Sequence, residues 1–216
     1  MDPTVQRLVA AAIIILVSFP VHEFAHAWVA YRLGDSTARY LGRLTLNPIV
    51  HFDPTGGFLL LVSSYAGAPI GWAKPTPVNF ANLRNGRLGE AMVTAAGPIS
   101  NLLLAAAGGI VFRVLRGVAT SPGQVDALNV VGIFVEINVI LFIFNLIPVP
   151  PLDGTRVLLA ALPPRTAFQF TPILYQYGQY VLLALIFIPL LTGVEGPLQF
   201  VFDHVGFPIT QFLTGT

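Results

Sequence analysis

Four long apolar stretches constrain the fold of this 216-residue chain more than any other feature. The hydrocarbon core of a bilayer is about 30 Å thick, and a helix rises about 1.5 Å per residue, so roughly 20 apolar residues cross it. Charged residues make up 10% of the chain, against about 25% in an ordinary soluble domain. The sequence therefore predicts an α-helical integral membrane protein with about four transmembrane helices, over residues 5–33, 88–115, 125–147 and 172–192.

Two further apolar segments do not fit this pattern. Residues 57–71 form a run that is short and rich in Gly, Ser and Pro, which favours a re-entrant or β-hairpin segment after the first helix. Residues 196–213 mix apolar residues with Gly, Pro, Asp and His, which suits a C-terminal segment at the membrane interface. We expect residues 1–216 to form a single membrane-embedded domain.

The basic residues predict an orientation, because Lys and Arg gather on the cytoplasmic side of membrane proteins. With four spans, eight basic residues share one side and three lie on or near the other. This count favours an orientation in which both termini lie outside the cell, in what we expect to be a prokaryotic plasma membrane. The net charge of +1 gives no indication of a nucleic-acid partner. The eight are Arg32, Arg39, Arg43, Lys74, Arg84, Arg87, Arg156 and Arg165, and the three are Arg7, Arg113 and Arg116.

The stretch V-H-E-F-A-H-A-W, residues 21–28, places ionisable side chains at the end of the first apolar stretch. Positions four apart lie on one helix face, so His22 and His26 can hold one metal ion with Glu23 beside them. Zinc suits imidazole ligands and activates a water, whose proton the adjacent carboxylate can take. An ionisable group within a span costs about 2.5 to 3.5 kcal/mol, which argues for a functional role.

A catalytic zinc site typically has three protein ligands, so a third is needed. The chain has no cysteine, and among its other acids Asp153 stands out, in F-N-L-I-P-V-P-P-L-D-G at residues 144–154. Three prolines within four residues break the helix, and free backbone groups at membrane depth need a polar surrounding. In the four-span arrangement Asp153 and the two histidines lie at the same, cytoplasmic end.

Three alternatives compete with a zinc enzyme. The apolar run before Ala25-His26-Ala27 resembles a signal peptide, although Asp2 and Arg7 make a poor cationic start. A non-enzymatic metal-binding scaffold, or a transporter, would also use broken helices and intramembrane acids. The glutamate after the first histidine favours hydrolysis, since a ligand cage or an ion pathway has no need for it.

Together these motifs resemble the site-2 protease family of intramembrane zinc metalloproteases. The resemblance rests on H-E-F-A-H, on L-G-R-L-T-L-N-P-I-V-H-F-D-P-T-G at 41–56, on G-W-A-K-P-T-P-V-N at 71–79, on A-G-P-I-S-N at 96–101, and on N-L-I-P-V-P-P-L-D-G at 145–154. It implies one Zn²⁺ per chain held by His22, His26 and Asp153. It also implies that Glu23 is the general base and that Asn145 positions the substrate or steadies the oxyanion.

The resemblance further implies a substrate and a form of the enzyme. The substrate would be a transmembrane or membrane-anchored protein, cut in or near the bilayer after binding as an extended strand to β-structure around 57–71. The short loops leave no room for a peptide-binding or nucleotide-sensing domain, so we expect a minimal catalytic core. For the remaining polar residues we expect a turn at His51 and Asp53, helix packing for Asn101, Glu136 and Asn138, and a loop or interface position for His204.

Overall fold

The computed structural model describes residues 1–65 and 71–216. In these residues four helices are long and apolar enough to cross a membrane, as predicted. There is no β-strand in the described part of the chain. The four helices cover Pro3–Leu33, Gly86–Val118, Pro122–Asn145 and Pro164–Pro189.

The first long helix carries the histidine motif and is continuous across a π-helical turn. It consists of α1 (Pro3–Ile13), a π-helical turn (Ile14–Ser18) and α2 (Phe19–Leu33). Pro20 has no N–H to donate to the preceding turn, and a wider π-turn there is one way for a helix to absorb that loss. The helix ends at Gly34, whose φ of 113° is open to glycine and rarely to other residues.

The segment after the first helix is helical where a β-hairpin was one expectation. It contains α3 (Thr37–Tyr40), α4 (Pro48–His51) and α5 (Pro54–Tyr65), and residues 66–70 of the expected hairpin lie outside the described part. Asp53 Oδ1 accepts the N–H groups of Thr55 and Gly56, each at 2.9 Å, so the expected turn at Asp53 is confirmed. At 12 residues, α5 is about 18 Å long and too short to cross a bilayer.

Helices α6 (Gly86–Val118) and α7 (Pro122–Asn145) form the centre of the molecule. A Cβ at Gly108 would lie 2.9 Å from Val135 Cγ2, so this glycine lets the two helices approach closely. Asn101 donates to Asn138 Oδ1 at 3.2 Å across the same interface, which confirms packing for Asn138. The prediction that Glu136 packs between helices through a hydrogen bond is wrong. Its side chain is exposed and makes no hydrogen bond or ion pair with the described residues.

The C-terminal segment forms helices that dock on the core. After α8 (Gly154–Ala161) and α9 (Pro164–Thr192), the chain folds into α10 (Pro197–Val201), a π-helical turn (Phe202–Gly206) and α11 (Phe207–Thr214). Apolar side chains of the last two pack against α6 and α7. His204 lies in this turn, exposed, rather than in a loop.

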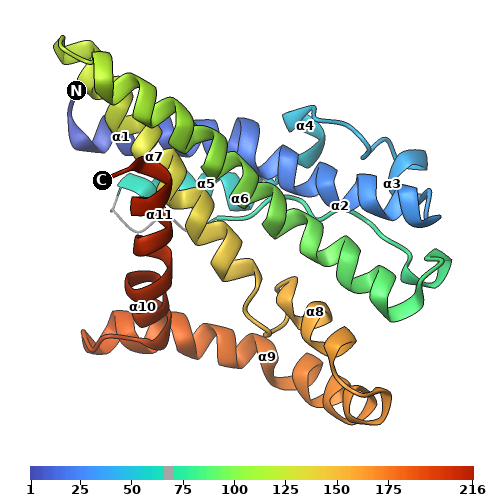
Figure 1. Ribbon diagram of the computed structural model, residues 1–216. Helices are drawn as coiled ribbons and strands as arrows, with labels where there is room; N and C mark the ends of the chain where they lie inside the picture. The colour runs from blue at the N-terminus through green and yellow to red at the C-terminus, as the bar shows by residue number, and fades with distance from the viewer. Residues whose placement is uncertain (66–70) are drawn as a thin grey trace.

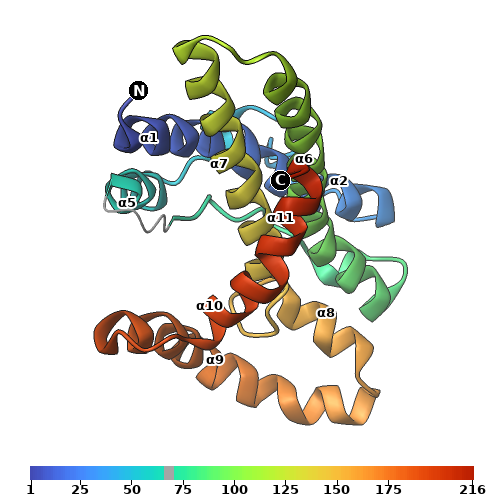
Figure 2. The same cartoon turned by 60° about the vertical axis from the view of Figure 1, so that its left-hand side comes forward.

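The long helices alternate in direction, as the four-span prediction requires. In Figure 1 the chain passes one way in α1 and α2, returns in α6, goes forward in α7 and returns in α9. The end of α2, the start of α6, the end of α7 and the start of α9 therefore lie toward one end of the molecule. In Figures 1 and 2 α9 runs along the outside, where it packs mainly on α8 and α10.

Candidate active site

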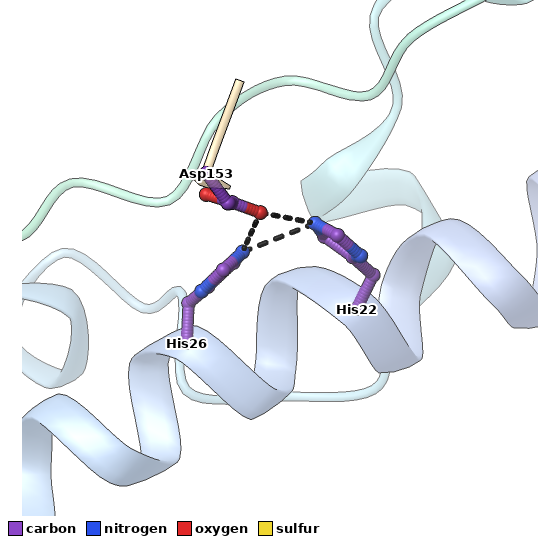
Figure 3. A group of neighbouring side chains, drawn as sticks. All are labelled: His22, His26 and Asp153. Atoms are coloured by element: carbon purple, nitrogen blue, oxygen red, sulfur yellow. Dashed lines mark hydrogen bonds and ion pairs between the residues drawn. The ribbon is translucent and has the colours of Figure 1, made fainter. Parts of the chain in front are cut away.

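His22, His26 and Asp153 come together although the aspartate is more than 120 positions further along the chain (Figure 3). The two histidines lie one turn apart on α2, with their Nε2 atoms 3.0 Å from each other. Asp153 Oδ2 lies 3.3 Å from His22 Nε2 and 3.2 Å from His26 Nε2. Two imidazole nitrogens and a carboxylate oxygen thus converge on one point, which is a donor set that suits zinc.

A tight backbone turn presents Asp153 to the histidines. A Cβ at Gly154 would lie 2.1 Å from the carbonyl oxygen of Leu146, so glycine is required where the proline-rich loop folds back into α8. Asp153 begins α8 but does not cap it with its side chain. Burial raises the pKa of the Asp153 carboxyl, yet its contacts with His22 and His26 outweigh this and hold the pKa well below its usual range. A carboxylate oxygen is one of the ligands that zinc accepts in proteins.

A chain of amides fixes which nitrogen of His22 faces the metal position. The Phe134 carbonyl can only accept, so Asn138 Nδ2 donates to it at 2.8 Å, and Asn138 Oδ1 accepts from Asn101 Nδ2. This leaves Asn101 Oδ1 as the acceptor, 2.6 Å from His22 Nδ1. His22 consequently donates from Nδ1, which leaves Nε2 as the nitrogen that can bind a metal.

His26 is oriented in the same way by the backbone of α6. Its Nδ1 donates to the carbonyl oxygen of Val93 at 2.7 Å, and the residue is 8% exposed. Both histidines thus direct Nε2 at Asp153.

Asn101 therefore supports a candidate ligand in addition to packing against α7, which the packing expectation did not foresee. We expect Asn101→Leu to lower zinc affinity by about 10- to 100-fold, because His22 would lose the acceptor that fixes its ring. Competition titration of zinc against a chelator measures this change. Asn101→Asp keeps an acceptor for His22 Nδ1, so its zinc affinity should fall less than that of Asn101→Leu. Equal zinc affinity in the wild type and Asn101→Leu would contradict the proposed support of His22 by Asn101.

Gly97 lies on α6 directly against the two histidines, and no sequence pattern predicted that position. A Cβ there would lie 2.3 Å from His26 Nε2 and 2.6 Å from His22 Nε2. The glycine thus leaves open the space next to the two nitrogens that point at Asp153. The only sequence signal is the G-P pair within A-G-P-I-S-N, which gives no spatial partner.

Glu23 lies beside this group and is held by the non-helical segment at 71–79. Glu23 as a whole residue is 8% exposed, and it lines the same cavity as the two histidines. Glu23 Oε2 accepts the N–H of Thr76 at 2.6 Å, and Thr76 Oγ1 donates to the Glu23 carbonyl oxygen at 3.0 Å. The segment is therefore tied to α2 at the candidate general base.

Arg43 and His51 hold the neighbouring part of that segment. The buried Arg43 donates through Nη2 to the carbonyl oxygens of Lys74 and Pro75, and it lies 3.4 Å from His51 Nδ1. A guanidinium only donates, so His51 accepts at Nδ1 and donates from Nε2 to the Thr45 carbonyl at 2.7 Å. His51 thus has a structural role here and does not join the candidate metal group.

A cavity of about 590 Å³ is lined by both histidines, Glu23 and Asp153. Asn145 lies in its wall, at the end of α7, where Nδ2 donates to the Leu141 carbonyl at 2.9 Å. The structure therefore places every predicted site residue on one cavity. Its lining comprises Phe19, His22, Glu23, His26, Gly71, Trp72, Ala73, Pro75, Thr76, Val78, Phe80, Val93, Thr94, Asn101, Leu141, Phe144, Asn145, Pro151, Leu152 and Asp153.

Comparison with known proteins identifies the family. The model of peptidase family M50 matches residues 111–188. A Bacillus subtilis protein named "Putative zinc metalloprotease YwhC" is 41% identical over 192 residues, covering 86% of this chain and 84% of that protein. "Putative zinc metalloprotease Rip2" of Mycobacterium tuberculosis is 30% identical over 216 residues, covering 94% of this chain and 79% of that protein.

A second Rip2, from Mycolicibacterium smegmatis, is 29% identical over 179 residues, covering 82% of this chain and 66% of that protein. No solved structure matches the chain. These relatives decide between the enzyme and the scaffold or transporter in favour of the enzyme, and zinc is the metal that the family uses. The chain belongs to peptidase family M50, the site-2 protease family, and is a membrane zinc metalloprotease.

Proposed function

We propose that this enzyme is an intramembrane endopeptidase, which hydrolyses a peptide bond in or near the transmembrane segment of a membrane protein and so carries out regulated intramembrane proteolysis. The observation that carries the proposal is the cavity that joins Glu23 to the His22, His26 and Asp153 group, because both histidines and Glu23 lie within the apolar helix Pro3–Leu33. A protease with this placement acts where its substrate is still within or next to lipid.

The side chains present fit one Zn²⁺ per chain. His22 and His26 offer Nε2 atoms on rings that Asn101 and Val93 hold in place, and Asp153 offers a carboxylate oxygen. Bound zinc supplies a Lewis acid that polarises the scissile carbonyl and lowers the pKa of a water. We infer that these three residues are its ligands.

Glu23 is the proposed general base. Because its Oε2 already accepts from Thr76, Oε1 is the oxygen that takes the proton of the attacking water and later delivers it to the leaving amine. The second hydrogen of Asn145 Nδ2 can bind the substrate carbonyl as negative charge develops on it.

The non-helical segment at 71–79 is the proposed binding site for the substrate backbone. Gly71, Trp72 and Ala73 of this segment line the cavity, and none of residues 71–79 belongs to a helix. A peptide bond within a helix is hydrogen-bonded and shielded, so the substrate has to unwind, and the backbone of this segment can then pair with it as a strand does. Helix-breaking residues in a substrate should therefore favour cleavage.

The proposed location follows from the charges. The cavity is lined by the last turn of α7 and by Asp153 just before α8. Eight of the 11 basic residues lie in the last turn of the first long helix, in the segments that follow that helix and α7, or in the first turn of α6 and α9. We infer that residues 1–216 act as one membrane-embedded catalytic domain, in a prokaryotic plasma membrane, with the active site toward the cytoplasm.

Removal of the metal tests the proposed function. We expect the purified enzyme in liposomes to contain one zinc per chain, to cleave a transmembrane model substrate, and to lose cleavage when a chelator strips the zinc. One equivalent of zinc should restore it. Zinc content by elemental analysis and product by mass spectrometry measure both quantities, and cleavage that persists in the stripped enzyme would overturn the proposal.

A further inference from the structure

Glu136 is an acid that the proposed chemistry does not use. It lies near the middle of α7, the most apolar of the four long helices, with a mean hydropathy of 2.3. Its side chain is exposed and has no hydrogen bond or ion pair within the described residues. An ionisable group within a span is costly and usually has a functional partner.

Two sides of α7 are already covered. Phe134, Ile137 and Leu141 pack against the first helix and α5. Val135, Val139 and Ile143 pack against α6 and the C-terminal helices, as described above. The face that carries Glu136 is therefore the one that remains open to a partner from the membrane.

That open face leads to the active-site cavity. Residues four apart share one face of a helix, so Ile140 and Phe144 follow Glu136 toward the end of α7. Phe144 lines the cavity, and Glu136 lies eight residues before it, at about 12 Å along the helix axis. A segment that enters the cavity along this face passes the carboxylate first.

We propose that Glu136 selects the substrate, by pairing with a Lys or Arg on a transmembrane segment that lies along the Glu136, Ile140 and Phe144 face. The next part of that segment would unwind into the cavity. The inference rests on the proposed function, and it adds a recognition site about two helical turns away from the chemistry.

Charge complementarity favours a substrate helix over other occupants of this face. Lipid hydrocarbon offers no partner for a carboxylate. A second copy of the chain meeting α7 through the same face offers none either, because residues 122–145 contain no Lys, Arg or His. A basic residue within a substrate span carries the same insertion cost as Glu136, and pairing relieves both.

Cross-linking tests the pairing without requiring catalysis. The chain has no cysteine, so Ile140→Cys in the Glu23→Gln enzyme provides a single reactive thiol next to Glu136. Transmembrane peptides with one cysteine and one lysine, moved stepwise along the helix, are reconstituted with it in liposomes. We expect one lysine position to raise the cross-linking rate about tenfold over a leucine peptide, and Glu136→Gln to remove this preference.

Two comparisons make the result decisive. Val111→Cys, on an exposed part of α6, should cross-link without regard to the lysine position. Glu136→Lys should prefer a glutamate peptide of the same register. Equal rates for lysine and leucine peptides at Ile140→Cys would overturn the proposal.

Cleavage assays with the enzyme that retains Glu23 separate this inference from the proposed function. We expect kcat/KM about tenfold higher for the preferred lysine peptide, mainly through KM, since the pair forms away from the scissile bond. Selective cross-linking with no cleavage of any peptide would leave recognition standing and defeat the proposed proteolysis. Cleavage at the same rate for every lysine position would support the proposed proteolysis and defeat the recognition by Glu136.

Discussion

Glu23→Gln should bind zinc like the wild type and cleave its substrate about 10²- to 10⁴-fold more slowly, which is the usual contribution of a general base. The amide has the size of the carboxylate, and its oxygen can still accept the N–H of Thr76, so the segment at 71–79 keeps its place. It cannot take a proton from water at neutral pH. Binding and chemistry should therefore separate in this one variant.

Zinc content and single-turnover cleavage, measured on the same preparation, test this expectation. Glu195→Gln is the matched control, because it makes the same chemical change at an exposed position between α9 and α10 and should leave both quantities unchanged. Full cleavage by Glu23→Gln would remove Glu23 from the mechanism. Loss of zinc in Glu23→Gln would show instead that Glu23 helps to hold the metal.

The sequence was sufficient for the long helices and for the residues that converge in the cavity. Apolar length alone predicts a span, since a bilayer leaves few other structures possible. The four-residue spacing of His22 and His26 places both rings on one face in any helix. Asp153 could be chosen because a proline-broken helix followed by Asp-Gly implies an irregular polar site, and Gly154 indeed meets the Leu146 carbonyl too closely for a side chain.

The segment after the first helix was harder, because its composition gives conflicting signals. Glycine and serine in residues 57–65 lower helix propensity, which favoured a hairpin. Helix-start signals decided the outcome: Asp53 accepts the N–H groups of Thr55 and Gly56, and Pro54 occupies the first helical position. The capping residues at the start of α5 therefore determine its structure more than the average composition of residues 57–65 does.

The supporting residues could not be predicted, because their partners are distant in sequence. His22 and Asn101 are 79 positions apart, and Thr76 meets Glu23 across 53 positions. No local periodicity records such contacts. Gly97 is the extreme case, since a residue without a side chain leaves no chemical signature, and its role appears only when the two histidines are placed against it.

Gly97→Ala should abolish zinc binding and cleavage together, with zinc affinity lowered by at least about 100-fold, the upper range for disturbing residues around a metal site. The added Cβ would lie 2.3 Å from His26 Nε2, well inside van der Waals contact, and 2.6 Å from His22 Nε2. Neither ring can yield without losing its bond to Val93 or Asn101. The methyl group would therefore occupy space that the ligand atoms need.

A change this small must be separated from simple misfolding of α6. A residue with a side chain before proline disfavours a helix, yet Phe19, Thr171 and Ile188 each precede a proline inside helices of this chain. Helix content by circular dichroism should accordingly match the wild type. Gly117→Ala, on the same helix with nothing near its Cβ, is the control that should keep zinc and activity. Full zinc content in a folded Gly97→Ala would mean that the histidines receive the metal away from α6, and the ligand geometry proposed above would have to be abandoned.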